Sequence, residues 1–301
     1  MSVIIPVHND AQRLGTCLAA LEQQTYPAHR YDIIVVDNGS EDEAALANVI
    51  AASSHASTVK EATPGSYAAR NRGIALAKGE ILAFTDADCI PAADWLEKGV
   101  KYLQANPQRG LVAGRIEMFF VDPDHVTAAA LYDQVVMGFP QQEFLETCRG
   151  AMTANIFTRR AVVETVGTFR TTLKSHSDLE WGARVYGAGY DQIYAEDAWV
   201  AHPARNSIQS LWQRTRRLSG GVYQVFYIEP DLSTWSRHKR FIKLVLDDLW
   251  KNNLSFSRRA LGDDRLDAWS IRGRVLIIVW LMQGVSALEK IRLRLGGQTQ
   301  R

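Results

Sequence analysis

The stretch Ile81-Leu82-Ala83-Phe84-Thr85-Asp86-Ala87-Asp88-Cys89 is an apolar run that ends in two aspartates. An uncharged run of this kind, flanked by Gly79 and Pro91, is typical of a strand buried in a parallel sheet. Open α/β sheets bind ligands outside the carboxyl ends of their strands. Two carboxylates there repel each other unless a cation joins them. The stretch therefore predicts a cation site or, equally well by itself, a solvated turn in which an aspartate caps a helix.

The residues around this stretch alternate between strand and helix patterns over the first ~110 residues. Apolar strands are expected at 3–7 and 33–36, with a weaker one at 58–60. The helices between them are marked by the stripe Leu14, Cys17, Leu18 and Leu21, by a Ser40/Glu43 capping box, and by the segment 66–77. This alternation predicts an α/β fold with a doubly wound, mostly parallel sheet.

Polar groups follow these strands, namely His8-Asn9-Asp10, Asp37-Asn38, and Asp86 with Asp88. Because parallel strands point the same way, these groups should converge at one edge of the sheet. Arg70, near the middle of the third helix, has a charge suited to a diphosphate at this edge. The alternative is that Arg70 only faces solvent on the surface of its helix. The sequence contains neither GxGxxG nor GxxxxGK[ST], which argues against a dinucleotide-binding Rossmann enzyme and a P-loop hydrolase.

The second part of the chain is less regular. Helices are expected at 95–104, 124–137 and 160–166, with a strand at 110–120 and a short apolar element at 155–157. Another helix opens at Ser177, and Asp178 falls in its first turn. A carboxylate is favoured at this position by the helix dipole, so a helix-capping role is one explanation for Asp178.

Composition indicates an ordinary globular protein. The 301 residues are 47% hydrophobic and 22% charged, with a net charge of +1 that gives no reason to expect nucleic acid as a partner. Cys17, Cys89 and Cys148 lie far apart without a CxxC pair. A disulfide framework or structural zinc site is therefore not expected. Three separate cysteines are consistent with a protein of a reducing compartment. No signal peptide is recognised, so the expected location is the cytoplasm.

The C-terminal segment is basic. From Arg237 onward the chain has fourteen Lys and Arg against six Asp and Glu. Its longest uncharged stretch, 275–288, is shorter than the ~18 residues of a membrane span, so no crossing is expected. Basic flanks around an apolar helix are compatible with contact at the inner face of the cell membrane, and packing on the catalytic domain or dimerisation are the alternatives.

Seven segments in this order resemble family 2 of the inverting glycosyltransferases, which share an A-type nucleotide-sugar fold. The resemblance covers about residues 2 to 220. The segments are 3–9, 34–40, 69–73, 77–80, 84–88, the run from Gly150 through 155–157 to 167–169, and the run from 178–184 through Gly189-Tyr190 to His202. A DxD pattern alone is common by chance, whereas the ordered set is specific.

The resemblance implies a nucleoside-diphosphate sugar as the donor, with UDP as the expected nucleotide. Asp37 would accept a hydrogen bond from the base, and Pro6, Val7, His8 and Asn9 would line its pocket. Arg70 would contact the nucleotide. Asp86, with its neighbour Ala87, would contact the ribose or a metal-bound water.

The resemblance also implies a divalent cation, Mn or Mg, held on the diphosphate by Asp88 and His202. Hard cations of this kind use oxygen ligands and neutralise a leaving diphosphate. For His202 a buried or solvent-facing histidine without a metal is the alternative. Asp178 would be the general base that deprotonates the acceptor hydroxyl for a single in-line displacement.

The acceptor side is less defined. The acceptor is expected to be a sugar, a lipid-linked group or a small molecule, and Arg115, Arg149, Trp181 and Glu180 are candidates to contact it. The family often has Glu-Asp where this chain has Ser177-Asp178, so Glu180 is a second candidate for the base. The segment 213–217 keeps the Gln and Arg of the Gln-x-x-Arg-Trp motif of processive synthases but lacks the Trp, which argues for transfer of a single sugar.

These patterns predict a catalytic domain at 1–235, with a nucleotide-sugar-binding half at 1–115 and an acceptor-side half at 116–235. A basic, amphipathic helical extension is expected at 236–301. Two other functions stay open. One is a non-catalytic nucleotide-sugar-binding or scaffolding relative. The other is a nucleotidyltransferase, although that class usually has a glycine-rich basic loop where this chain has His8-Asn9-Asp10.

Overall fold

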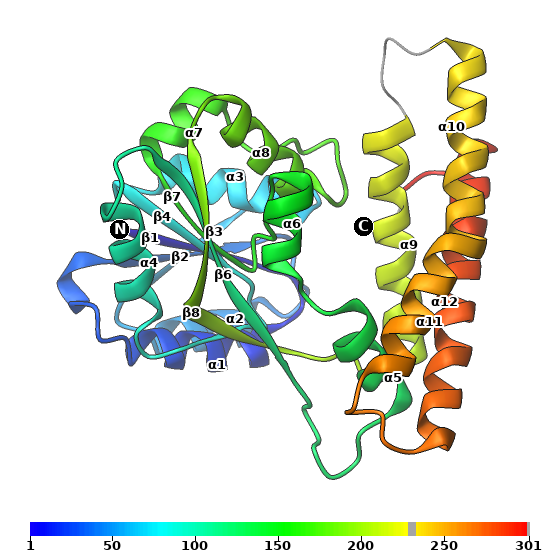
Figure 1. The fold of residues 1–301 in the computed structure, drawn as a ribbon. Helices are drawn as coiled ribbons and strands as arrows, with labels where there is room; N and C mark the ends of the chain where they lie inside the picture. The colour runs from blue at the N-terminus through cyan, green and yellow to red at the C-terminus, as the bar shows by residue number, and fades with distance from the viewer. Residues whose placement is uncertain (228–232, 300–301) are drawn as a thin grey trace. The chain divides into compact units, whose positions relative to one another are not determined.

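The computed structural model describes residues 1–227 and 233–299. The chain divides into two compact units (Figure 1). The α/β unit comprises Met1–Glu117, Phe139–Thr171 and Ser177–His202, and the helical unit comprises Met118–Gly138, Thr172–His176 and Pro203–Arg301. The helical unit is larger than the extension expected at 236–301, because it also includes the helix at 208–227 and two segments from the middle of the chain.

An eight-stranded sheet forms the centre of the α/β unit, in the order β3-β2-β1-β4-β7-β6-β8-β5. The first four strands along the chain, β1 (Ser2–Val7), β2 (Asp32–Asp37), β3 (Ala56–Lys60) and β4 (Ile81–Thr85), pair in parallel. The antiparallel pairs β4–β7, β6–β7 and β5–β8 involve β5 (Ile90–Pro91), β6 (Arg109–Phe119), β7 (Asn155–Arg159) and β8 (Asp191–Pro203). The α/β fold with a C-terminal helical extension is confirmed.

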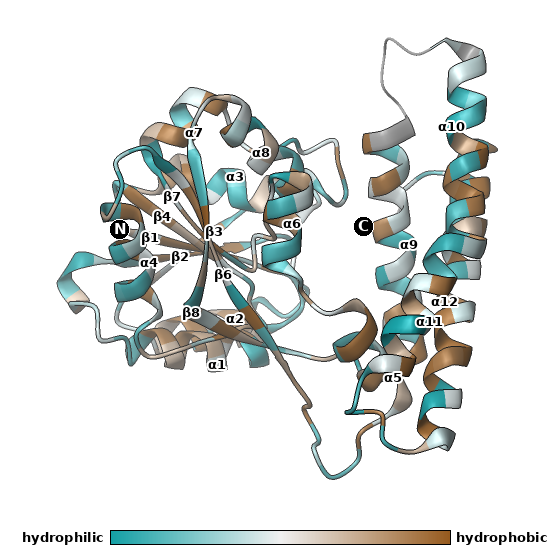
Figure 2. Ribbon diagram, in the orientation of Figure 1, coloured by the Kyte–Doolittle hydropathy of each residue, from teal (hydrophilic) through white to brown (hydrophobic). Residues whose placement is uncertain are grey.

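Both faces of the parallel strands are buried. Along β1, Val3 and Ile5 belong to one hydrophobic cluster and Ile4 to another, as the alternation of side chains along a strand requires. Helices α1 (Ala11–Glu22), α2 (Glu43–Ala51) and α4 (Trp95–Gln104) contribute to the first cluster, and α3 (Ser66–Leu76), α6 (Gln141–Cys148), α7 (Arg160–Val166) and α8 (Ser177–Gly187) to the second. Figure 2 shows the hydrophobic residues concentrated in these central strands.

Parallel pairing brings the strand ends to one edge. Val7 lies opposite Asp37, and Ile4 lies opposite Phe84, two residues before Asp86. The expected convergence of the polar groups after β1, β2 and β4 is therefore found.

Two local expectations were wrong, and one strand was missed. The N-cap of α2 is Asp42, which accepts from Ala45 N at 2.8 Å, because Ser40 instead turns its backbone N–H toward Asp37. The helix expected at 124–137 begins only at Ala128 and continues as a π-helix over Tyr132–Met137. The long strand β8 was not anticipated.

The helical unit contains α5 (Ala128–Leu131), α9 (Ile208–Tyr227), α10 (Thr234–Leu246), a π-helix at Asp247–Asn252, α11 (Asn253–Gly262) and α12 (Trp269–Arg294). Its core joins side chains of α5, α9, α11 and α12, including Leu211, Ala260 and Val279. Among residues 1–227 and 233–299, α12 is the one helix long and apolar enough to cross a membrane, and 44% of its most apolar window is buried. Core helices of globular proteins have the same length and composition.

Candidate active site

The loops after β1 and β2 are tied together by short polar side chains. Asp37 is buried and accepts from Ser40 N at 2.9 Å. Asn9 accepts from Glu41 N at 2.8 Å, and its own N–H donates to the Ser40 hydroxyl at 3.0 Å. Asn9 has a positive φ of 53°, which asparagine tolerates better than most residues. These bonds leave His8 and Asn9 exposed beside Asp37 at the sheet edge, and Pro6 and Val7 at the end of β1 lie directly before them.

Asn38 organises the next loop, a role that was not predicted. Its amide donates to the carbonyl oxygens of Glu61 and Thr63, each at 2.8 Å, and its Oδ1 accepts from Gly65 N at 2.7 Å. Asn38 thus fixes the start of α3, the helix that contains Arg70. The signal available in the sequence was an asparagine directly after the strand-ending Asp37.

Arg70 and Asp86 form an ion pair. The Arg70 side chain is buried, its guanidinium lies 5.7 Å from the centre of the Tyr67 ring, and its Nε has no hydrogen-bond partner in the described part of the chain. A buried donor without a partner is costly, and such donors are often completed by a ligand or water. The two expected nucleotide contacts therefore bind each other and leave one buried donor open. Ala87, next to Asp86, is buried.

Asp88 and His202 meet although they are far apart in sequence. Pairing of β5 with β8 places Ile90 opposite Ala201, and the His202 Nε2 atom lies 3.6 Å from Asp88 Oδ1. His202 is buried, with its ring centre 4.5 Å from that of Phe139. Arg13, a residue that was not predicted, has its Nη1 3.7 Å from Asp88 Oδ2.

The donor atoms of this cluster suit a divalent cation. Ligand atoms of Asp88, Cys89 and His202 lie within 4.8 Å of one another. Carboxylate oxygen is the ligand that Mg and Mn prefer, and imidazole nitrogen also suits transition metals such as Mn. Burial and the charges of Asp86 and Asp88 raise the pKa of the Cys89 thiol well above its ordinary value, which disfavours the thiolate that binds metals. Asp88 and His202 therefore fit as the ligands.

Asp178 is buried in the first turn of α8 and has hydrogen bonds to both carboxylate oxygens. Oδ1 accepts from the Tyr67 hydroxyl at 2.9 Å and from Leu179 N at 3.1 Å. Oδ2 accepts from the N–H and the hydroxyl of Thr153, at 3.1 and 3.4 Å. Only the Leu179 N–H belongs to α8, so Asp178 links its helix to α3 and to the segment before β7.

Two glycines allow this arrangement. A Cβ at Gly150 would lie 2.5 Å from the Leu179 carbonyl oxygen, and one at Gly182 would lie 2.6 Å from Gly150 Cα. Side chains at either position would push the segment 149–151 away from α8. The glycines thus hold Thr153 within reach of Asp178.

The four acceptor candidates are not gathered around Asp178. The Glu180 carboxylate pairs with Arg170 and Arg184. Trp181 is 1% exposed and donates its indole N–H to the Gly167 carbonyl, so it is a core residue without surface for an acceptor.

Arg115 and Arg149 have other partners. Arg115 pairs with Glu117 and Glu196 on the sheet. The guanidinium of Arg149 lies 4.7 Å from the centre of the Tyr186 ring.

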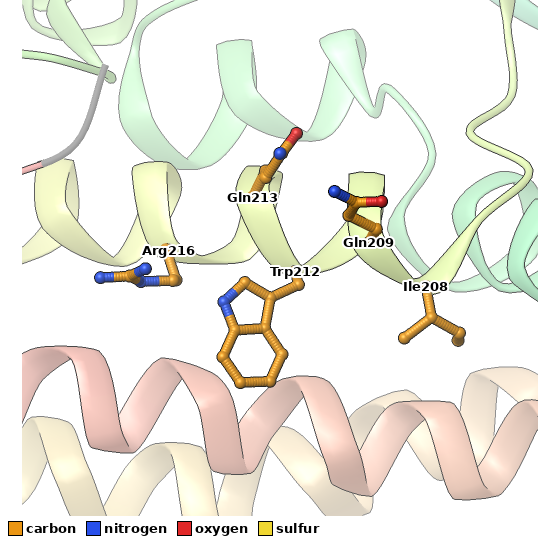
Figure 3. A pocket seen from close by; sticks show the side chains of 5 residues that line it. All are labelled: Ile208, Gln209, Trp212, Gln213 and Arg216. Carbon is orange, nitrogen blue, oxygen red and sulfur yellow. The ribbon is translucent and has the colours of Figure 1, made fainter.

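The helical unit has a pocket of its own along α9. Ile208, Gln209, Trp212, Gln213 and Arg216 line it. Figure 3 shows Trp212 and Arg216 directed toward a neighbouring helix and Gln213 directed away from it. The Gln and Arg of the partial Gln-x-x-Arg-Trp motif thus point in different directions. The Nε of Arg216 donates to Glu289 at 2.8 Å.

Comparison with known proteins gives consistent matches. Residues 2–167 match the sequence model of glycosyl transferase family 2. Glycosyltransferase AglE of Haloferax volcanii is 39% identical over 232 residues, which are 76% of this chain and 75% of AglE. The pre-mycofactocin glycosyltransferase of Mycobacterium tuberculosis is 29% identical over 239 residues. The matched region is 77% of this chain and 48% of the mycobacterial protein.

Solved structures share the fold. The mannosyltransferase PcManGT from Pyrobaculum calidifontis, solved with GDP-Man and Mn2+, has a TM-score of 0.64 at 18% identity, covering 99% of this chain and 87% of that one. S. aureus TarS 1-349, solved with UDP-GlcNAc, has a TM-score of 0.55 at 15% identity, covering 99% and 93%.

Proposed function

The chain belongs to glycosyl transferase family 2, and we propose that it transfers a single sugar from a nucleoside-diphosphate sugar to a hydroxyl group with inversion at the anomeric carbon. The main support is the placement of Asp86, Asp88 and His202 at the carboxyl edge of the sheet. In the same unit, Asp178 is joined to Asp86 through Tyr67 and Arg70.

We propose that the donor nucleotide lies along the ends of β1 and β2. Asp37 accepts an N–H of the base, and the exposed residues His8 and Asn9 border the ring. Uridine offers an N–H to such a carboxylate, so UDP is the proposed nucleotide. Guanosine offers N–H groups as well, and the similar solved structures include one with GDP-Man and one with UDP-GlcNAc.

Asp88 and His202 are the proposed ligands of a Mn or Mg ion. An ion held there would neutralise the charge that develops on the departing diphosphate. Arg70 supplies a further positive charge, and its open Nε donates to a phosphate oxygen.

Asp178 is the proposed base. The acceptor hydroxyl replaces the Thr153 hydroxyl, which makes the longest of the four contacts to the carboxylate. As the acceptor oxygen forms a bond to the anomeric carbon, its proton passes to Asp178 and the bond from that carbon to the diphosphate breaks. The nucleoside diphosphate leaves with the electron pair. General-base help of this kind contributes about 10²–10⁴ in rate.

The test is an assay of nucleoside diphosphate release from UDP-, GDP- and dTDP-sugars with Mn, for the wild type and Asp178→Asn. We expect release from at least one donor, strongly reduced in the variant, and NMR of the product should show an inverted anomeric configuration. A folded protein that binds a donor but whose slow donor hydrolysis is unchanged by Asp178→Asn would instead be a non-catalytic binding relative. Retention of configuration would contradict the displacement.

A further inference from the structure

Helix α12 presents apolar side chains to solvent along most of its length. Ile277 is 69% exposed and Leu288 66% exposed, and Trp280, Leu281, Ile291 and Leu295 are exposed as well. Their spacing of three, four and seven residues places them on one stripe of the helix. Hydrophobic residues recur along this helix in Figure 2. A helix on the surface of a water-soluble protein normally turns its polar residues outward.

Polar residues in the C-terminal half of α12 are on its buried side. Lys290 pairs with Asp248, Glu289 pairs with Arg216, and Ser286 accepts a hydrogen bond from Ser219 at 2.7 Å. All three α12 residues are buried. Between Val275 and Ile291, the charged residues of α12 therefore lie on its buried side beside apolar core residues, while its exposed side is apolar.

A second apolar stripe runs along α10 and the π-helix that follows it. Exposed large apolar residues recur there, namely Trp235, Ile242, Leu246, Leu249 and Trp250. Exposed lysines are interspersed with them, at 239, 243 and 251, and the Lys239 ammonium lies 5.0 Å from the centre of the Trp235 ring. Tryptophan and lysine together are characteristic of helices that lie at a membrane–water interface.

We propose that these two stripes form a lipid-facing surface that binds an anionic bilayer. Exposed apolar patches of this extent mark membrane or protein interaction sites. The charge decides between them, because the segment from Arg237 onward has fourteen Lys and Arg against six Asp and Glu. Two copies of such a basic surface repel each other, whereas anionic lipid headgroups attract it, at about 1 kcal/mol per basic residue near the surface.

The surface lies on the bilayer and does not cross it. The inner face of α12 contains the Lys290–Asp248 and Glu289–Arg216 pairs, and charged side chains within a membrane-spanning segment are costly. Arg272 and Arg274 precede the stripe, and Arg292 and Arg294 lie at its C-terminal end, between Ile291 and Leu295. Cations at both ends suit a helix that lies along the headgroups.

The test is sedimentation of the full chain with vesicles of phosphatidylcholine alone or mixed equally with phosphatidylglycerol, without donor or acceptor. Its outcome is thus independent of the proposed transfer. We expect binding to the mixed vesicles only, weakened by salt. Ile277→Glu with Leu288→Glu should weaken it by at least about tenfold, since each replaces an exposed apolar side chain that the bilayer would bury. Val121→Glu, at an exposed apolar residue of the same unit outside both stripes, should leave binding unchanged.

Lys239→Glu with Lys243→Glu is a second variant, which keeps the apolar residues of both stripes and should also weaken binding. Thermal melting checks that each variant is folded. Three results would overturn the proposal: absence of vesicle binding by the wild type, a dimer that the glutamate substitutions disperse without any vesicle binding, or chain that stays in the membrane after alkaline carbonate extraction.

Discussion

The hydroxyl of Tyr67 donates a hydrogen bond of 2.9 Å to Oδ1 of Asp178, which lies 111 residues further along the chain. One turn of α3 beyond Tyr67 is Arg70, whose guanidinium lies over the Tyr67 ring and pairs with Asp86. A single helix turn therefore holds both the carboxylate proposed for the donor side and the carboxylate proposed as the base.

Tyr67→Phe tests this link. The substitution keeps the ring under Arg70 but removes one donor from Asp178, so the carboxylate is held less firmly. Loss of a hydrogen bond to a charged group costs about 1.5–3 kcal/mol, or roughly tenfold or more in kcat. We expect a lower kcat at unchanged donor affinity, measured by steady-state kinetics and calorimetry. The control is Tyr186→Phe at an exposed tyrosine of α8. An unchanged kcat in Tyr67→Phe would contradict the positioning role.

Gly150→Ala should disturb the Asp178 carboxylate through the segment before β7, which contains Thr153. The new methyl group would lie 2.5 Å from the Leu179 carbonyl, so the first turn of α8 must move. Overpacking of this kind costs about 1–3 kcal/mol of stability. We expect a lower melting temperature and a lower kcat. Gly187→Ala is the control, because this glycine is in the last turn of the same helix and nothing else lies within 4 Å of the added methyl group. It should have the melting temperature and the kcat of the wild type. Equal behaviour of the two variants would contradict the packing argument.

The stability of the α/β unit should fall in acid through Glu22. Burial alone would raise the pKa of this carboxyl, but hydrogen bonds from Ser53, His55 and Ser54 lower it to about 2, from an ordinary value of 4.5. A lowered folded-state pKa stabilises the protein above pH 4.5, and this contribution is lost as the pH falls from 4.5 to about 2.

Glu22→Gln should therefore be less stable than the wild type at neutral pH, and the difference should shrink across that acidic range. Urea unfolding of both proteins at a series of pH values measures this difference in the free energy of unfolding. Glu164→Gln, at an exposed glutamate of α7, is the matched control and should behave as the wild type. A constant difference between Glu22→Gln and the wild type at all pH values would show that the carboxylate charge is not responsible.

The helical unit depends on the buried carboxylate of Asp133, which is 0% exposed and pairs with Arg205 and Arg214. Burial lowers the pKa of Arg214 to about 10, although the charge of Asp133 opposes this. Removing one partner of a buried pair costs about 3–5 kcal/mol. We expect Asp133→Asn to lose stability on that scale in urea unfolding, and Asp264→Asn, at an exposed aspartate, to lose almost none. A small effect of Asp133→Asn would show that the pair is not a main support of this unit.

The parallel part of the sheet could be predicted because β1, β2 and β4 are buried on both faces and therefore have unbroken apolar runs. Strand β8 could not, because its buried residues are small ones such as Ala195 and Ala198, separated by Glu196 and Asp197. The resemblance marked His202, but the contact with Asp88 depends on that strand pairing with β5.

Asp37, Asp86 and Asp88 were predictable from their position after strands, whereas Asp178 was indicated only by the resemblance. The hydrogen-bond partners of these carboxylates were not predictable. The bond between Tyr67 and Asp178 depends on how α8 packs against α3. Trp181 was an acceptor candidate in the less regular second part of the chain, yet the packing of α8 turns it into the core. Side-chain direction on a helix follows from packing, which the local sequence does not specify.

The most direct test of the account is calorimetric titration of UDP-, GDP- and dTDP-sugars into the wild type and Asp88→Asn, with Mn and with EDTA. We expect at least one donor to bind with Mn, and we expect its binding to weaken strongly both in EDTA and in Asp88→Asn. Asp94→Asn, which alters a carboxylate paired with Lys98 at the start of α4, should bind as the wild type does. Donor binding that is equally tight without the metal and without the Asp88 carboxylate would contradict the account, as would a folded wild type that binds none of the donors.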